Sequence, residues 1–200
     1  DAVKVDATGY YTHLKDALVR RDFQLNGLDS IMYQGELSQV QAIHNAAVAK
    51  VYGIQVGVEV KLPQGFGFST DVNFQNGEEE LDNGTTSPSR HAAPFFGTSR
   101  LNYKAERLQM EINLAYQGKR NFKDLPEEEK EKTEIYALDG NGNAFAPDWY
   151  TLNFKALYKM TDNLDISGGI ENLTDQRYRP YSSGISGAGR NFILSLTAHF

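Results

Sequence analysis

The stretch RNFILSLTAHF, residues 190–200, alternates between apolar and polar side chains. One parity holds Phe192, Leu194, Leu196, Ala198 and Phe200, and the other is polar apart from Ile193. A period of two indicates a β-strand with one apolar and one polar face. The stretch nevertheless closes on an aromatic residue, although the ends of soluble domains are usually polar and frayed. The apolar face therefore needs a partner other than water.

The same alternation recurs along the whole chain. It predicts seven further strands, at residues 3–11, 52–62, 66–75, 95–104, 108–117, 150–160 and 164–171. Each of these segments has roughly ten residues, which is the length that a tilted strand needs to cross a membrane. The predicted fold class is therefore all-β, with about eight antiparallel strands.

The connections between these strands alternate strictly between short and long. The tight turns fall at residues 61–66, 104–108 and 160–164. The long segments fall at residues 23–49, 76–94, 118–148 and 179–189. Transmembrane β-barrels sort their connections in this way, with short turns on the periplasmic side and long loops outside. On this interpretation the last strand runs inward, and Phe200 lies at the periplasmic interface.

Composition limits the class of protein without deciding it. The chain has 200 residues, 40% of them hydrophobic, and a formal net charge of -6. No apolar run approaches the roughly 18–20 residues of a membrane-spanning helix, whereas a barrel has the same average composition as a soluble protein. The acidic balance argues against nucleic-acid binding. The absence of cysteine excludes disulfides, thiolate metal sites and cysteine nucleophiles.

The two parities predict which side chains face lipid and which face the lumen. Ionisable groups are costly on the lipid face of a barrel, so the apolar parity should point outward. The residues expected to face outward are Ile54, Val58, Phe68, Ile112, Phe154 and Leu194. The residues expected to face inward are Glu59, Lys61, Asp71, Arg100, Glu111 and Lys155.

Several motifs suggest chemistry but have simpler explanations. Residues 138–149, LDGNGNAFAPDW, have the first three ligand spacings of an EF-hand loop, but position six is Ala144 and position twelve is not glutamate. Turn formation explains this stretch better than calcium binding. The charge run DLPEEEKEKTE, residues 124–134, is typical of a solvated loop or one exposed helical turn. The four histidines share no metal-ligand spacing, and no nucleophile–base pattern supports an enzyme.

The C-terminal third contains GIENLTDQRYRPY (169–181), then GRNF (189–192), and a final strand that closes on an aromatic. In these features it resembles the end of a TonB-dependent outer-membrane receptor. Members of that family are 22-stranded barrels with an N-terminal plug domain inside. The resemblance implies that residues 1–200 are the C-terminal portion of such a barrel, about its last eight strands, without the plug.

The resemblance also implies a function, a location and partners. It implies a TonB-coupled importer of a ferric siderophore or haem in the bacterial outer membrane, with no resident cofactor and no catalytic residue. Its partners would be membrane lipids, the TonB complex through the N-terminal region, and the barrel-assembly machinery, for which Phe200 would be part of the signal. His44, His91, Arg179 and Tyr181 are the candidate ligand contacts, because His, Tyr and Arg side chains bind haem and catecholates.

Two alternatives remain open from the residues themselves. A complete eight-stranded barrel of the OmpA type, structural or adhesive, suits the length of the chain. A soluble β-sandwich or lipocalin-like binder would bury apolar residues on its inner parity, whereas here the inner parity is polar.

Overall fold

The computed structural model describes residues 2–81, 84–90 and 92–200. Its main sheet is antiparallel, with the strand order β1-β4-β5-β7-β8-β11-β12-β13 and a short β6 (Thr86–Pro88) paired with β5. The bounds are β1 Val3–Asp22, β4 Gln41–Lys61, β5 Phe66–Glu80, β7 Phe96–Lys104, β8 Leu108–Gln117, β11 Trp149–Thr161, β12 Leu164–Glu171 and β13 Asn191–Ala198. Within the described part of the chain, no helix has the length and apolar character that crossing a membrane requires.

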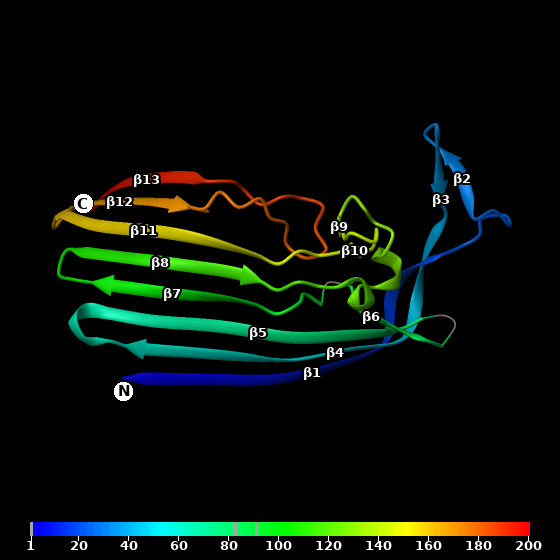
Figure 1. The fold of residues 1–200 in the computed structure, drawn as a ribbon, viewed down its shortest axis with the longest axis horizontal. Helices are drawn as coiled ribbons and strands as arrows, with labels where there is room; N and C mark the ends of the chain where they lie inside the picture. Colours follow the sequence, from blue (N-terminus) through cyan, green and yellow to red (C-terminus); the bar gives the residue numbers. More distant parts are fainter. Residues whose placement is uncertain (1, 82–83, 91) are drawn as a thin grey trace.

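The eight strands predicted from the alternation form this sheet, so the all-β fold class is confirmed. Each strand pairs with its neighbour in the sheet, and the three tight turns lie together at one end, near the N-terminus and the C-terminus (Figure 1). Among the described strands, β1 pairs with β4 alone and β13 with β12 alone. The sheet therefore has two open edges, as a segment of a larger barrel would have.

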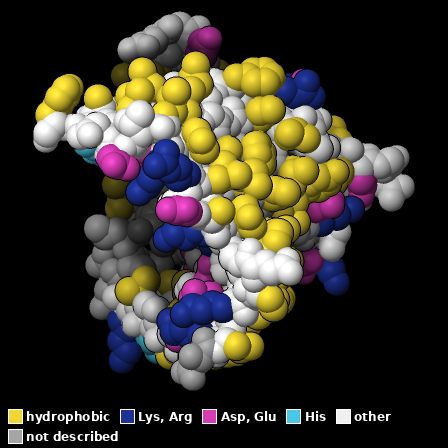
Figure 2. All heavy atoms as spheres, turned by 90° about the vertical axis from the view of Figure 1, so that its left-hand side faces the viewer, with side chains coloured by type: hydrophobic (Ala, Val, Ile, Leu, Met, Phe, Trp, Pro, Cys, Tyr) yellow, Lys and Arg dark blue, Asp and Glu magenta, His cyan; other side chains and the backbone are white. Residues whose placement is uncertain are grey.

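The strand register places the apolar parity of every strand on one face. One apolar row runs across four strands through Phe68, Leu101, Ile112 and Phe154. A neighbouring polar row runs through Glu111 and Lys155 to Gly169, which faces Ile193. Ile193, the one exception to the alternation, therefore lies on the polar face. Figure 2 shows hydrophobic side chains over one curved side of the molecule and charged side chains around the hollow on the other.

The polar face carries polar contacts between side chains of different segments. Arg100 Nη1 lies 3.2 Å from Asp71 Oδ2 across the β5–β7 pair. His199 Nε2 lies 3.3 Å from Asp165 Oδ2 near the end with the tight turns. On the apolar face, Ile112 and Leu194 are 44% and 78% exposed. Lipid is the medium that suits this face, because large exposed apolar surfaces are rare on soluble monomers.

Aromatic side chains mark two belts on the apolar face. The inner belt includes Phe66 and Tyr103, whose ring centroids lie 4.8 Å apart. The outer belt includes Phe74, Phe95 and Tyr116, with centroid distances of 4.7 Å and 5.5 Å along the row. On β5 the two belts are about nine residues apart, counted inclusively, which matches the roughly 9–11 residues of a membrane-crossing strand. The membrane boundaries therefore lie at these belts.

Two strands continue far beyond the outer belt, which corrects the prediction of a loop at residues 23–49. The β1–β4 ladder extends to the pair Asp22↔Gln41, and a small hairpin of β2 (Ser30–Tyr33) and β3 (Glu36–Gln39) follows at its tip. The ladder persists because backbone hydrogen bonding between two strands does not require an apolar face. The sequence pattern missed this extension because strand prediction relied on alternation alone.

The final strand is shorter than predicted. β13 ends at Ala198, and Phe200 follows it as a fully exposed side chain. Beyond the strand, His199 N–H donates to Asn163 O at 2.9 Å, and Asn163 Nδ2 donates to His199 O at 3.0 Å. These two bonds hold the end of the chain against the β11–β12 turn. Phe200 thus lies at the end with the tight turns, as predicted.

Candidate functional site

Three connecting segments meet at the end opposite the tight turns, and we call them the outer loop layer. They join β5 to β7, β8 to β11 and β12 to β13 (Figure 1). The second segment contains two short 3-10 turns, Phe122–Asp124 and Glu127–Glu129, and two short strands, β9 (Ala137–Leu138) and β10 (Ala144–Phe145). Its buried cluster is Leu125, Tyr136, Ala144 and Ala146. This layer has a packed interior of its own.

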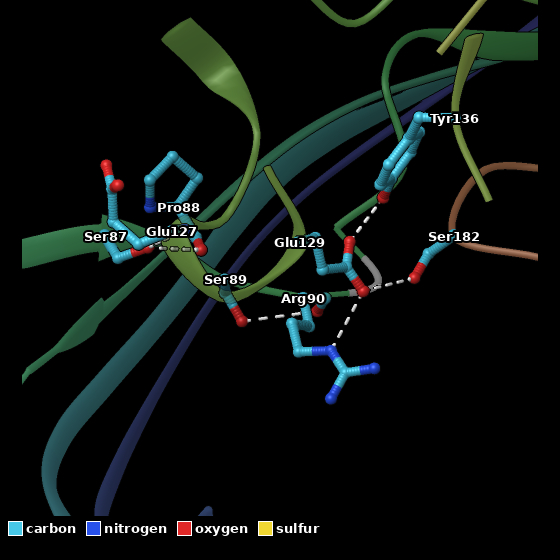
Figure 3. A network of polar contacts seen from close by, with 8 residues as sticks. All are labelled: Ser87, Pro88, Ser89, Arg90, Glu127, Glu129, Tyr136 and Ser182. Atoms are coloured by element: carbon cyan, nitrogen blue, oxygen red, sulfur yellow. Dashed lines mark hydrogen bonds and ion pairs between the residues drawn. The ribbon is translucent and has the colours of Figure 1, made fainter. Parts of the chain in front are cut away.

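A buried carboxylate lies at the centre of the layer (Figure 3). The Glu129 side chain has no exposed surface. Its Oε1 accepts hydrogen bonds from Arg90 Nε at 3.0 Å and from Ser182 Oγ at 2.8 Å. Its Oε2 accepts a hydrogen bond from the Tyr136 hydroxyl. The partners come from all three segments, so a single carboxylate joins them.

The burial of Glu129 corrects the prediction that residues 124–134 form a solvated stretch. Leu125, Pro126 and Glu129 are fully buried, and Ser87 Oγ accepts a hydrogen bond from the Glu127 amide at 3.1 Å. The physical reason is that Arg90, Tyr136 and Ser182 replace the water that the carboxylate loses. Three consecutive glutamates look alike in the sequence, so no local signal distinguishes the buried one.

The surroundings of Glu129 set its pKa. Burial by itself raises the pKa of this carboxyl, whereas hydrogen bonds from Tyr136, Ser182 and Arg90, with the charge of Arg90, lower it. The balance places the pKa below its ordinary value of 4.5. A carboxyl whose pKa is lower in the folded state stabilises the fold at pH values above its pKa in the unfolded state. This stabilisation is lost as the pH falls through its pKa in the folded state.

We expect the outer loop layer to keep constant protection between pH 7 and about pH 5, and to lose it only below the ordinary carboxyl range. Hydrogen exchange of the segment around Glu129, corrected for the intrinsic effect of pH, measures this. The Glu129→Gln variant lacks the titrating group, so its protection should be lower already at pH 7 and should show no further acid-induced loss from this position. Loss of protection already between pH 7 and 5 in the parent protein would contradict the depressed pKa.

The NLTDQRY element, at the end of β12, makes hydrogen bonds that join the two ends of the segment between β12 and β13. Asn172 is 3% exposed, and its Nδ2 donates to Gln176 O at 2.8 Å and to Ala188 O at 3.0 Å. Asp175 Oδ1 accepts from the Arg190 amide at 2.8 Å, and Arg190 Nε donates to Leu173 O at 3.0 Å. The spacing between this element and the later Gly-Arg therefore reflects a closed loop whose two ends bind each other.

Arg179 and Tyr181, two of the predicted ligand contacts, come together in the outer loop layer. Arg179 Nη1 donates to Glu134 O at 2.7 Å. The Tyr181 amide donates to Gln117 Oε1 at 3.1 Å, and its ring lies 5.5 Å from the Arg120 guanidinium and 6.2 Å from the Tyr136 ring. Burial raises the pKa of the Tyr181 hydroxyl, so this side chain is a neutral phenol at physiological pH.

A cavity of about 390 Å³ opens beside these residues. Its wall includes Tyr136, Trp149, Arg177, Tyr178, Arg179, Tyr181 and Ser182. Trp149 and Tyr178 stack with their ring centroids 4.5 Å apart. Among the described residues, Gln117 Nε2, Arg120 Nε and Trp149 Nε1 are buried donors without a hydrogen-bond partner, and of these three residues Trp149 lines the cavity. The site thus combines aromatic surfaces, cationic groups and an unused donor.

The structure does not describe the side chains of the two histidines predicted as ligand contacts. His44 lies in strand β4 opposite Val19, and not in a loop as predicted; its side chain is outside the described part of the structure. His91 lies outside the described residues. The structure therefore brings Arg179 and Tyr181 to one site and leaves both histidines as predictions.

The EF-hand-like stretch is a turn, as the sequence favoured. Asp139 Oδ1 accepts hydrogen bonds from the amides of Asn141 at 2.8 Å and Asn143 at 2.9 Å. Gly142 has a φ of 81°, in the left-handed region. The backbone hydrogen bonds lower the pKa of Asp139. Within the residues that the structure describes, no group of three or more His, Asp or Glu side chains is arranged to hold a metal ion.

Comparison with known families identifies the fold. The model of the family described as TonB dependent receptor-like, beta-barrel matches residues 1–173. This chain belongs to that family. TonB-dependent receptors are transporters of the bacterial outer membrane and not enzymes, so the outer-membrane location is established at the level of the family.

Solved structures of outer-membrane transporters and receptors match 98–100% of this chain. The copper transporter OprC has a TM-score of 0.72 and 14% identity, over 100% of this chain and 29% of that chain. The siderophore receptor PirA from Acinetobacter baumannii has a TM-score of 0.69 and 18% identity, over 100% of this chain and 30% of that chain. The FrpB iron transporter from Neisseria meningitidis has a TM-score of 0.67 and 16% identity, over 98% of this chain and 28% of that chain.

At these identities the likeness shows the fold alone. This chain spans less than a third of the length of each of these three proteins. No curated protein sequence matches it. The open edges of the sheet agree with that coverage, because a segment of a TonB-dependent barrel leaves its first and last strands without their neighbours.

Proposed function

We propose that this chain is the C-terminal part of the barrel of a TonB-coupled importer, and that the importer takes up a ferric catecholate siderophore. The observation that carries the proposal is the cavity in the outer loop layer. Arg177 and Arg179 supply positive charge there, and Trp149 and Tyr178 supply stacked aromatic surface. A ferric tris-catecholate is anionic, aromatic and rich in acceptors, so it complements every one of these groups.

The unused donors support the same class of ligand. Gln117 Nε2, Arg120 Nε and Trp149 Nε1 are all donors, and an unpaired buried donor costs about 1–3 kcal/mol. A ligand with several oxygen acceptors removes that penalty for each donor that it reaches, and Trp149 is the donor residue in the cavity wall. A neutral apolar ligand leaves the penalty in place, so the donor excess favours an anionic chelate.

The polar face supports transport through the barrel rather than a purely structural role. Charged side chains such as Asp71, Arg100 and Lys155 line the side opposite the lipid-facing parity. The sheet does not close on itself, which opposes a complete eight-stranded barrel of the OmpA type. In the importer that we propose, a plug domain fills the lumen against this face and contacts the TonB complex, and the barrel-assembly machinery inserts the barrel.

Growth on defined iron sources tests the proposed function. The full reading frame that contains this chain is expressed in a bacterium that lacks its own catecholate receptors, under iron restriction. Ferric enterobactin is a suitable probe, because one structural neighbour, PfeA from Pseudomonas aeruginosa, is named as its receptor. We expect growth that requires TonB. Growth on neither ferric enterobactin nor any other catecholate, with the barrel folded in the membrane, would refute the proposal.

Alanine substitutions at Arg179 and Tyr181 should each raise the half-saturation concentration of ferric enterobactin uptake by about tenfold, because truncated arginine and aromatic contacts commonly cost more than 1 kcal/mol. Uptake of radiolabelled chelate by whole cells measures this. Arg107→Ala is the matched control, since Arg107 is an exposed arginine at the opposite end of the sheet. Unchanged uptake in both loop variants would remove these residues from the proposed site.

Haem is the second candidate ligand, and it rests on His44 and His91, because imidazole nitrogen is the usual ligand of haem iron. In the same growth assay with haem as the iron source, growth that is lost in the His44→Ala and His91→Ala variants would favour haem. Growth on ferric enterobactin that is unaffected by these two substitutions favours the siderophore.

A further inference from the structure

The carboxylate of Glu129 joins segments that are remote in sequence. Arg90 precedes β7, Tyr136 precedes β9, and Ser182 lies between β12 and β13. The three donors approach the two carboxylate oxygens from different sides (Figure 3). Two further bonds reinforce the same contacts: Glu127 N–H donates to Ser87 Oγ, and Arg179 Nη1 donates to Glu134 O.

Burial makes this junction cooperative. A carboxylate without exposed surface has lost its hydration, and only the full set of donors compensates that loss. If one segment moves away, the carboxylate either lacks a donor or must become hydrated. The remaining segments are then held less firmly. From this geometry we expect the three segments of the outer loop layer to separate together rather than one at a time.

The junction also borders the cavity of the proposed function. Tyr136 and Ser182, two of the three donors to Glu129, lie in the wall of the cavity together with Arg179 and Tyr181. Tyr136 packs against Tyr181, with their ring centroids 6.2 Å apart. The position of the Glu129 carboxylate therefore fixes part of the wall, although Glu129 itself is not among the residues that line the cavity.

We propose that Glu129 is a positioning residue that holds the three outer segments as one preformed unit and thereby sets the shape of the ligand cavity. The first part of this proposal, that Glu129 holds the three segments together, concerns the ligand-free protein. The second part rests on the proposed function, since it assigns the cavity to a ferric chelate. A preformed site binds more tightly because less chain has to be ordered when the ligand arrives.

Distances between loops test the first part. Lys123 and Ser186 are exposed and lie on two different segments of the layer, and this chain has no cysteine of its own. Spin labels at Lys123→Cys and Ser186→Cys in the full receptor give the distribution of distances between these segments by pulsed electron resonance. We expect a narrow distribution in the parent and a broad one in Glu129→Ala. Ser182→Ala, which removes one donor and keeps the charge, should lie between them.

Glu131→Gln is the matched control, because it removes an exposed carboxylate two residues away and should leave the distribution narrow. Heat-modifiable mobility in gels shows that each variant still contains a folded barrel. If Glu129→Ala fails to fold, Ser182→Ala decides the question. A distribution as narrow as that of the parent in a folded Glu129→Ala or in Ser182→Ala overturns the proposal.

Uptake of ferric enterobactin tests the second part. We expect Glu129→Gln to raise the half-saturation concentration by about tenfold while it preserves the maximal rate, since the change disorders the site but leaves the transport route intact. Broadened distances with an unchanged half-saturation concentration would overturn the positioning role. A parent protein that imports no catecholate would instead overturn the proposed function, and the distance measurement would still decide whether Glu129 joins the loops.

Discussion

Replacing Ile112 by arginine is expected to destabilise the folded barrel by about 2–4 kcal/mol. Ile112 lies on the apolar face, with Leu101 and Phe154 beside it on the adjacent strands. It is four residues from Tyr116 in the outer belt, close to the middle of the apolar band. An arginine at this depth must lose its hydration or draw water and head groups into the bilayer, and both are costly.

Asn102→Arg is the control for this prediction. Asn102 follows Leu101 on β7 but belongs to the polar face, where its cross-strand neighbour is Glu111. The same charge there faces the polar lumen and lies close to a carboxylate, so we expect a change within about 0.5 kcal/mol. Unfolding of the full receptor in lipid bilayers by guanidinium chloride measures both effects. Equal destabilisation by the two substitutions would contradict the assignment of the two faces.

Replacing Phe200 by aspartate is expected to lower the amount of folded protein in the outer membrane several-fold and to leave synthesis unchanged. The fully exposed side chain makes little contact within this chain, so loss of packing does not explain the expected effect. The aromatic ring would instead anchor the final strand at the inner interface, where a carboxylate is unfavourable. We propose in addition that the barrel-assembly machinery recognises this strand by edge pairing, and that Phe200 is part of the signal.

Heat-modifiable mobility of membrane fractions measures the folded barrel, and total protein measures synthesis. Phe200→Tyr keeps an interfacial aromatic and should assemble normally. His199→Ala removes the neighbouring side chain but leaves the backbone bonds to Asn163, so it should also have little effect. Normal assembly of the aspartate variant would rule out an interfacial or signalling role for Phe200.

Several features of the fold were predictable because they repeat in every strand. Lipid on one side and a polar lumen on the other impose the same period of two along the chain, so local alternation located the eight long strands of the main sheet, though not the short β6. The tight turns were predictable for the same reason, since they interrupt the alternation only briefly. Ile193 breaks the pattern at a position that faces Gly169, where the polar face has no opposing side chain.

The sequence by itself thus determined the strands, their two faces, and that the tight turns lie together at one end of the sheet. Only the tertiary structure decided that β1 and β4 extend beyond the membrane as a paired ladder, since backbone pairing leaves no alternation to detect. It also decided that Glu129 is buried while the other charged residues of the same run are not. That outcome depends on Arg90 and Ser182, which lie 39 residues before it and 53 residues after it. A contact between remote loops leaves no periodic mark in the sequence, because it arises only once the strands have placed those loops side by side.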